Sequence, residues 1–112
     1  MATLIIFTIP TEPEYYGVDE EDEAQAVADD LEKLTLEFAP RAFPGYEIEV
    51  RRVPDTVGYG NRTRVLPDEE EELDTLTDED AVGFQEQVWE VYLHHGCDLQ
   101  DTRRVLAKQF VG

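Results

Sequence analysis

The stretch "TLIIFTIP", residues 3–10, decides the fold of this chain. It is a short, continuous run of apolar and β-branched residues that ends at Pro10. A run of this kind is typical of a strand buried on both faces, near the centre of a sheet. At 112 residues the chain is long enough for one domain with a modest core. We therefore expect the other elements to be arranged around this strand.

The next segment predicts a helix over residues 19–38, after a loop at 11–18. Asp19 is placed to cap the N-terminus, and acids fill the first turn, where the helix dipole favours negative charge. Pro40 and the "FPG" at 43–45 predict where the helix stops. The side chains expected on its buried face recur with a 3.6-residue period: Ala24, Val27, Ala28, Leu31, Leu34, Thr35 and Phe38.

Two further strands follow this helix. The alternation in "YEIEVRRV", residues 46–53, predicts a half-buried strand. After the turn-rich residues 54–61, residues 62–66 predict a third strand. We expect the strands at 46–53 and 62–66 to form a β-hairpin with a long loop.

The second half of the chain predicts two helices. Thr77 and Asp80 resemble a capping box at the start of the first, and Gly96 is placed as the C′ residue that ends it. Asp98 is placed to cap the last helix, over residues 99–110. The side chains expected to face the core are Ala81, Phe84, Val88, Val91, Tyr92 and His95 in the first helix, and Leu99, Val105, Leu106 and Phe110 in the second.

This order predicts a small single α+β domain over residues 1–112, with an acidic connector at 67–76. The elements follow as β-α-β-β-α-α, and a three-stranded sheet is covered by helices. A strand–helix–strand unit should place the strands at 3–10 and 46–53 parallel, through a right-handed crossover.

The charge of the chain is extreme and uneven. The formal net charge is -18, from 27 acids and nine bases. Residues 1–40 carry eleven acids and a single base, Lys33, and residues 67–81 carry nine acids and no base. Residues 41–66, by contrast, carry five arginines against three acids. Such a balance disfavours direct contact with phosphate-rich partners and attracts basic surfaces.

Other features indicate the compartment. The longest apolar run, "LIIF", is far too short to span a bilayer. Strand-like sequence directly after Met1 predicts that there is no signal peptide. Cys97 is the single cysteine and cannot form an internal disulfide, which fits a reducing environment. We expect a cytoplasmic protein that uses no membrane, cofactor or metal.

The helix-borne acids are candidates for a partner-binding surface. Carboxylates four residues apart on a helix lie about 6 Å apart along its axis, and their repetition can imitate the charge of a nucleic-acid backbone. From Glu12 to Glu32 ten acids precede any base, whereas an ordinary solvated helix face mixes lysine with glutamate. The candidate binding residues are Asp19, Glu20, Glu21, Asp22, Glu23, Asp29, Asp30, Asp68, Glu69, Glu70, Glu71 and Glu72, with Trp89 as a hydrophobic contact.

These residues lead to the hypothesis of a small inhibitor that occupies the basic surface of a nucleic-acid-binding protein. It would resemble, in strategy alone, the acidic antagonists that phages encode against restriction, CRISPR or host DNA-binding proteins. Two alternatives stay open. The acids can form a merely solvated surface, or they can be the salt adaptation of a non-enzymatic accessory domain, since only Lys33 and Lys108 are lysines. The nearly neutral residues 82–112 count against a general salt adaptation.

A small basic cluster interrupts the acidic blocks: Arg51, Arg52, Arg62 and Arg64. Gly58 and Gly60 beside it could bring backbone N–H groups close to an anion. No phosphate-loop or dinucleotide pattern accompanies them. The favoured interpretation is therefore that these arginines pair with the chain's own carboxylates.

Catalysis and metal binding find little support. The chain has no serine, and Cys97 has only His94 and His95 as neighbouring bases. No second group of histidines or cysteines completes a metal site, and histidines are favoured at a helix C-terminus by the dipole. We expect no enzyme, and a small enzyme or metal-binding protein stays as the third alternative.

A second apolar stripe, Val82, Trp89 and Leu93, lies about 100° or more around the helix from the core-facing stripe. The favoured interpretation is that the last helix packs on it. The alternative leaves the stripe exposed, with Trp89 as the anchor for a partner or for a homodimer.

Overall fold

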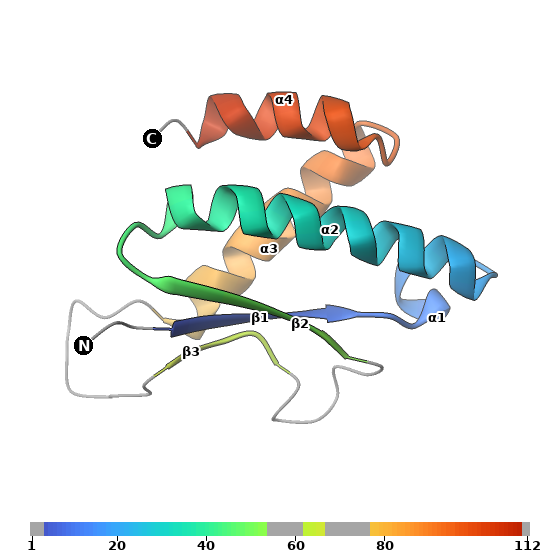
Figure 1. Ribbon diagram of the computed structural model, residues 1–112. Helices are drawn as coiled ribbons and strands as arrows, with labels where there is room; N and C mark the ends of the chain where they lie inside the picture. The colour runs from blue at the N-terminus through green and yellow to red at the C-terminus, as the bar shows by residue number, and fades with distance from the viewer. Residues whose placement is uncertain (1–3, 54–61, 67–76, 111–112) are drawn as a thin grey trace.

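Strand β1 (Leu4–Pro10) is the centre of a three-stranded sheet with the order β2-β1-β3 (Figure 1). The computed structural model describes residues 4–53, 62–66 and 77–110. Ile5 and Ile6, which point to opposite faces of the strand, are 0% and 2% exposed. The predicted burial of "TLIIFTIP" on both faces and its central place are confirmed.

Strand β2 (Glu47–Val53) lies parallel to β1, in a register that runs from Leu4 opposite Glu47 to Pro10 opposite Val53. The parallel pairing predicted from the strand–helix–strand order is confirmed. Ile48 and Val50 are partly buried against the core, as the alternation of this strand predicts.

Strand β3 (Arg64–Leu66) corrects the predicted hairpin. It pairs antiparallel with β1, with Val65 opposite Ile5, and does not pair with β2. The physical reason lies in β1, because a strand that is apolar on both faces would expose an unpaired backbone edge if β3 joined β2. Pairing with β1 covers that edge and places Val65 in the core, 4% exposed.

Helix α2 (Glu21–Ala42) is displaced from the predicted range of 19–38 at both ends. Its N-cap is Glu20, without a side-chain capping bond, so the predicted cap by Asp19 is wrong. The acids of its first turn still lie at the helix N-terminus, where the helix dipole favours negative charge. At the other end the helix continues past Pro40, and the N–H of Phe43 closes the last turn on the carbonyl of Ala39 at 2.8 Å.

The segment predicted as a loop at 11–18 contains a short helix, α1 (Pro13–Tyr16). Pro13 stands in its first turn, where its missing N–H costs nothing. Gly17 ends the helix with a φ of 69°, in the left-handed region that glycine adopts without strain. This single turn sets the positions of Tyr15 and Tyr16.

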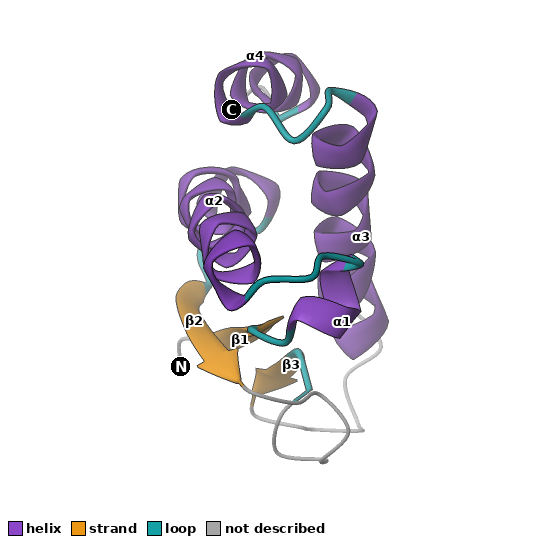
Figure 2. Ribbon diagram, turned by 90° about the vertical axis from the view of Figure 1, so that its right-hand side faces the viewer, coloured by secondary structure: helices purple, strands orange, loops and turns teal. Residues whose placement is uncertain are grey.

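The described helices lie on one side of the sheet, in two layers. Figure 2 shows α2 above the sheet, with α3 (Asp78–His94) beside it and α4 (Leu99–Gln109) on the side away from the sheet. The main elements thus follow the predicted β-α-β-β-α-α order, and the protein is a small α+β domain. The shared core consists of Ile5, Phe7, Leu34, Phe38, Ala39, Val65, Ala81, Phe84, Val88, Tyr92 and Leu106.

Both ends of α3 follow the sequence signals. Thr77 and Asp80 form the predicted capping box. At the other end Gly96 has a φ of 66°. Its N–H bonds the carbonyl of Leu93 at 3.1 Å, and the N–H of Cys97 bonds that of Tyr92 at 2.9 Å. This is a Schellman motif with Gly96 at C′, as predicted. Asp98 also caps α4 as predicted, by accepting from the N–H of Asp101.

Arg103 joins α4 to α2 through the carboxylate of Glu37. Its Nε and Nη2 donate to Oε2 and Oε1 at 2.7 and 2.9 Å. This hydrogen bond holds the pKa of Glu37 below its ordinary value. We expect Arg103→Gln to raise the pKa of Glu37 toward that value, as measured by NMR titration of the side-chain carboxyl.

The lowered pKa of Glu37 determines how folding stability depends on pH. A carboxyl with a lowered pKa in the folded state stabilises the fold above its unfolded pKa, and the contribution is lost as the pH falls through the folded pKa. The stability difference between Arg103→Gln and the wild type should therefore shrink in acid. Arg104→Gln is the control, because Arg104 pairs with Asp101 within α4. An unchanged Glu37 pKa in Arg103→Gln would contradict the prediction.

Candidate protein-binding surface and cleft

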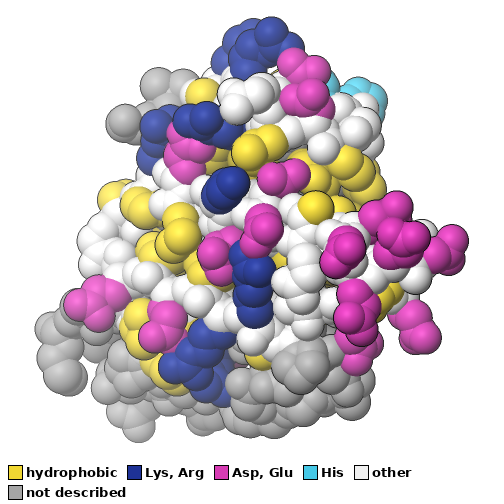
Figure 3. Space-filling view, turned by 45° about the vertical axis from the view of Figure 1, so that its right-hand side comes forward, with side chains coloured by type: hydrophobic (Ala, Val, Ile, Leu, Met, Phe, Trp, Pro, Cys, Tyr) yellow, Lys and Arg dark blue, Asp and Glu magenta, His cyan; other side chains and the backbone are white. Residues whose placement is uncertain are grey.

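The acidic run Asp19–Glu23 lies between α1 and the first turn of α2. All five side chains are exposed. Among the residues that the structure describes, none of them has an ion-pair or side-chain hydrogen-bond partner. Figure 3 shows acidic side chains gathered on the side of the molecule where α1 and the start of α2 lie. These five carboxylates form an exposed surface that no cation of the described residues compensates.

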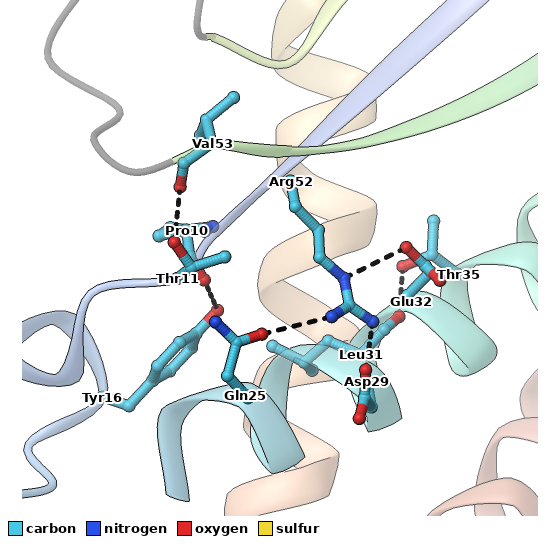
Figure 4. A network of polar contacts seen from close by, with 10 residues as sticks. All are labelled: Pro10, Thr11, Tyr16, Gln25, Asp29, Leu31, Glu32, Thr35, Arg52 and Val53. Atoms are coloured by element: carbon cyan, nitrogen blue, oxygen red, sulfur yellow. Dashed lines mark hydrogen bonds and ion pairs between the residues drawn. The ribbon is translucent and has the colours of Figure 1, made fainter. Parts of the chain in front are cut away.

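Asp29 has an internal partner instead. Arg52, on β2, reaches across to α2 and binds three side chains there (Figure 4). Its Nη2 pairs with Asp29 Oδ1, its Nε donates to Glu32 Oε1 at 3.3 Å, and its Nη1 donates to Gln25 Oε1 at 3.3 Å. The hydrogen bond with Asp29 is the main cause that raises the pKa of Arg52. Asp29 therefore helps to hold β2 on α2.

Asp30 is also engaged within the fold. It accepts a hydrogen bond from the hydroxyl of Tyr92 at 2.7 Å, and Tyr92 is 2% exposed. Burial, and then this bond, raise the pKa of Tyr92. Asp30 thus satisfies a core hydroxyl. The other predicted acidic block, residues 68–72, lies outside the described residues, as does the connector 67–76.

The basic cluster divides into two parts. Arg51 pairs with Glu49 at 2.5 Å and Arg52 with the acids of α2, so the interpretation that these arginines pair with the chain's own carboxylates is confirmed for both. Arg62 and Arg64 form no ion pair with a carboxylate of the described segments. Gly58 and Gly60 lie outside those segments.

The second apolar stripe is not covered as the favoured interpretation predicts. Val82 and Leu93 are 38% and 48% exposed, so the packing of the last helix on this stripe is wrong. Trp89 packs instead against Tyr16 of α1 and Tyr92 of its own helix, with ring centroids 5.5 and 6.1 Å apart. The reason is α1, which brings an aromatic ring to this face. Helix α4 contacts another side of α3, where Phe110 meets Phe84 at 5.4 Å.

A cleft of about 680 Å³ lies where the end of β1, α1, α3 and residues 62–64 meet. Tyr15, Tyr16, Val82 and Trp89 contribute its apolar wall. The hydroxyl of Tyr16 donates to the carbonyl of Pro10 at 2.6 Å and so fixes α1 against the end of the strand. Burial raises the pKa of that hydroxyl. The cleft thus has a wall of aromatic rings with one ring firmly placed.

The inner side of the cleft is polar, and Thr8, Thr63 and Gln85 bond one another there. The N–H of Thr8 donates to Thr63 Oγ1 at 3.1 Å, and the amide of Gln85 donates to the carbonyl of Thr8 at 3.1 Å. The hydroxyl of Thr63 in turn donates to Gln85 Oε1. Since buried polar groups are costly when unpaired, this network fixes β1, β3 and α3 around the cleft.

Sequence reasoning found Trp89 but missed Tyr15 and Tyr16 as parts of this cleft. The signal was present in "PEYYG", residues 13–17, because a proline followed by a glycine four residues later fits a single helical turn. What the sequence does not contain is the direction of that turn, which brings the ring of Tyr16 to Trp89 on α3. The contact depends on residues more than seventy positions apart in the chain.

The segment around His94, His95 and Cys97 forms the turn between α3 and α4. Within the described ranges, no three histidine, cysteine or acidic side chains are placed to hold one metal ion. Cys97 is exposed and has a φ of 60°. No described helix is long and apolar enough to cross a membrane.

Comparison with models of protein families, with curated proteins and with solved structures found no match for this chain. The fold class therefore depends on the observed sheet and helices alone. The exposed acidic run and the cleft are the features of the described residues that bear on function.

Proposed function

We propose that this protein binds a basic surface of a nucleic-acid-binding protein and competes there with the nucleic acid. The observation that supports this proposal is the acidic run Asp19–Glu23, whose five carboxylates are exposed and have no cationic partner among the described residues. A basic partner would relieve their mutual repulsion and would gain a fast, electrostatically steered association.

The charge density of the run is close to that of a nucleic acid. Glu21, Asp22 and Glu23 lie in the first turn of α2, where successive residues rise about 1.5 Å along the axis. The run therefore carries at least the one charge in about 3.4 Å that is found along one strand of B-DNA. Asp29 and Asp30 contribute less to this charged surface, because their carboxylates already bind Arg52 and Tyr92. The proposal therefore rests on the acidic run.

The test compares two double variants that change the net charge equally. Glu20→Gln with Glu23→Gln removes two charges from the run, and Glu47→Gln with Glu90→Gln removes two from exposed positions elsewhere. The assay measures displacement of a labelled DNA duplex, and of a labelled RNA strand, from a panel of basic DNA- and RNA-binding proteins at about 0.1 M salt, where the Debye length is about 10 Å.

The wild type and the Glu47/Glu90 variant should displace nucleic acid from at least one member of the panel. The Glu20/Glu23 variant should associate about tenfold more slowly, with a smaller change in dissociation, because surface charges act mainly on the association rate. Failure of the wild type to displace nucleic acid from any partner would refute the proposal, and so would equal losses in the two variants.

A second candidate is a non-enzymatic accessory domain of a salt-adapted proteome. The observation that favours it is the scarcity of lysine, with only Lys33 and Lys108 among nine bases. In that case the exposed acids would serve hydration and solubility, and no basic partner would be required. The dependence of thermal stability on salt distinguishes the two candidates.

A further inference from the structure

The cleft beside the acidic run combines exposed apolar groups with aromatic rings. Tyr15 is 58% exposed and Val82 is 38% exposed, although both are large hydrophobic side chains. Both line the cleft, together with Tyr16 and Trp89. Exposed apolar groups that gather at a cleft indicate a contact with another molecule. The rings offer π-faces on which a planar cation is attracted by the ring quadrupole.

Two carboxylates line the same cleft as these rings. Glu79 and Glu86 are exposed, line the cleft, and have no hydrogen-bond or ion-pair partner in the described part of the chain. They lie on α3 with Val82 and Trp89, at spacings of three, four and seven residues that bring side chains to one side of a helix. Asp78 is different, because its Oδ1 already accepts from the N–H of Val65 at 2.7 Å.

We propose that the cleft binds an arginine side chain of the basic partner. Its planar guanidinium would stack on the exposed rings of the cleft and would donate in a fork to the carboxylate of Glu86, which is three residues from Trp89 on α3. This proposal rests on the proposed function, since it names the group by which the partner is recognised. The cleft would thus be an anchor site beside the acidic run. It would prefer arginine to lysine, because the lysine ammonium has no planar face to stack.

The cleft and the acidic run lie close together. Tyr16 and Asp19 are three residues apart in the chain, which corresponds to at most about 11 Å. One basic segment of a partner can therefore place an arginine in the cleft and further cations over the run. Aromatic and arginine anchors in central pockets are the usual hot spots of protein–protein interfaces, and charges around them steer association.

An anionic ligand fits the same cleft less well. Arg62 and Arg64 line it, but so do Asp78, Glu79 and Glu86, and the acidic run lies beside them. The chain as a whole carries a net charge of -18. Its field repels phosphates and carboxylates and concentrates cations, so the charges around the cleft favour the guanidinium.

Trp89 provides a direct test, because it is the single tryptophan of the chain and lies in the cleft. The protein is titrated with a blocked hexapeptide of alternating arginine and glycine, and with the same peptide carrying lysine, while tryptophan fluorescence is recorded. We expect a saturable change in emission and about five- to tenfold tighter binding of the arginine peptide, because both cations are attracted by the rings but only the guanidinium also stacks on them and donates as a fork.

Variants assign the binding to the cleft. Glu79→Gln with Glu86→Gln should weaken the arginine peptide about tenfold, whereas Glu47→Gln with Glu90→Gln, of equal charge, should weaken it less than about twofold. All four positions are exposed, so the folded state should be retained, and far-UV circular dichroism verifies it.

Three results would overturn the arginine site: an unchanged Trp89 emission, equal affinities for the two peptides, or equal losses in the Glu79/Glu86 and Glu47/Glu90 variants. Saturable binding of a nucleoside monophosphate that strengthens in the Glu79/Glu86 variant would also overturn it, in favour of Arg62 and Arg64 as an anion site. If the cleft variants lose the peptide but the wild type displaces no nucleic acid, the proposed function fails and the arginine site stands. If nucleic acid is displaced without any peptide binding, the arginine site fails alone.

Discussion

The substitution Phe7→Ala is expected to lower the free energy of unfolding by about 3–5 kcal/mol. Phe7 is 0% exposed in the middle of β1, and its ring lies 5.6 Å from that of Phe84 and 6.3 Å from that of Phe43. Its removal would leave a cavity between the sheet and the helices that those neighbours cannot fill without moving. Urea unfolding followed by circular dichroism measures the loss, which should lower the midpoint with little change in slope.

Leu36→Ala is the matched control for this prediction. Leu36 is also a large apolar side chain, but it is 50% exposed on α2, and surface substitutions of this kind usually change stability by about 0.5 kcal/mol or less. Similar losses in the two variants would show that Phe7 does not lie in the cooperative core. A domain of this size has about 5–15 kcal/mol of stability in total, so the predicted loss is a large part of it.

Salt should stabilise the wild-type protein strongly. Raising sodium chloride from 0.01 to 1 M shortens the Debye length from about 30 to 3 Å, which screens most of the repulsion that a net charge of -18 creates in the compact state. If screening recovers about 2 kcal/mol, the melting temperature rises by on the order of 10 °C. Thermal unfolding followed by circular dichroism at stepped salt concentrations measures this rise.

The shape of the salt curve separates the two candidate functions. Screening of a local charged surface should level off well below 1 M, because the Debye length is then already shorter than the spacing of most exposed charges. A melting temperature that continues to climb into molar salt would favour the salt-adapted accessory domain. The Glu20→Gln, Glu23→Gln variant should gain less from salt than the wild type, and a flat curve for both proteins would contradict the electrostatic argument.

Much of the fold could be predicted because its signals are local. The run at residues 3–10 contains its own burial pattern, and α2 shows its buried face in one stretch of sequence. The cap at Thr77 and the C′ glycine at Gly96 depend on neighbours within a few residues. Such signals determine an element without reference to the remainder of the chain.

The partner of β3 could not be predicted in this way. Residues 62–66 suit a hairpin with β2 as well as they suit a pairing with β1, and the choice is made by the edge that β1 would otherwise leave exposed. The path of α2 past Pro40 is a similar case. Pro40 is a local signal that ends a helix, but the burial of Ala39, which is 0% exposed, outweighs it there.

The candidate site likewise has a part that local sequence predicts and a part that depends on residues distant in the chain. The sequence identified Asp19–Glu23 as a dense acidic run, and density is a local property. It also grouped Asp29 and Asp30 with that run, since nothing near them in the sequence indicates Arg52 on β2 or Tyr92 on α3 as partners. The cleft needs α1, α3 and the end of β1 together, so only parts of its lining, Trp89 and Val82 with Arg62 and Arg64, could be selected beforehand.

The central position of β1 has a consequence for how the chain reaches its fold. Leu4 pairs with Glu47 on one side and with Leu66 on the other. The most apolar strand therefore precedes both of its partner strands in the chain, and it stays unpaired until they pair with it. Contacts between positions so distant in sequence close large loops, and proteins rich in them cross their folding barrier more slowly than helical bundles of equal size. During that interval the many acids around the unpaired strand repel other chains, which protects a nascent sheet from aggregation until β3 docks.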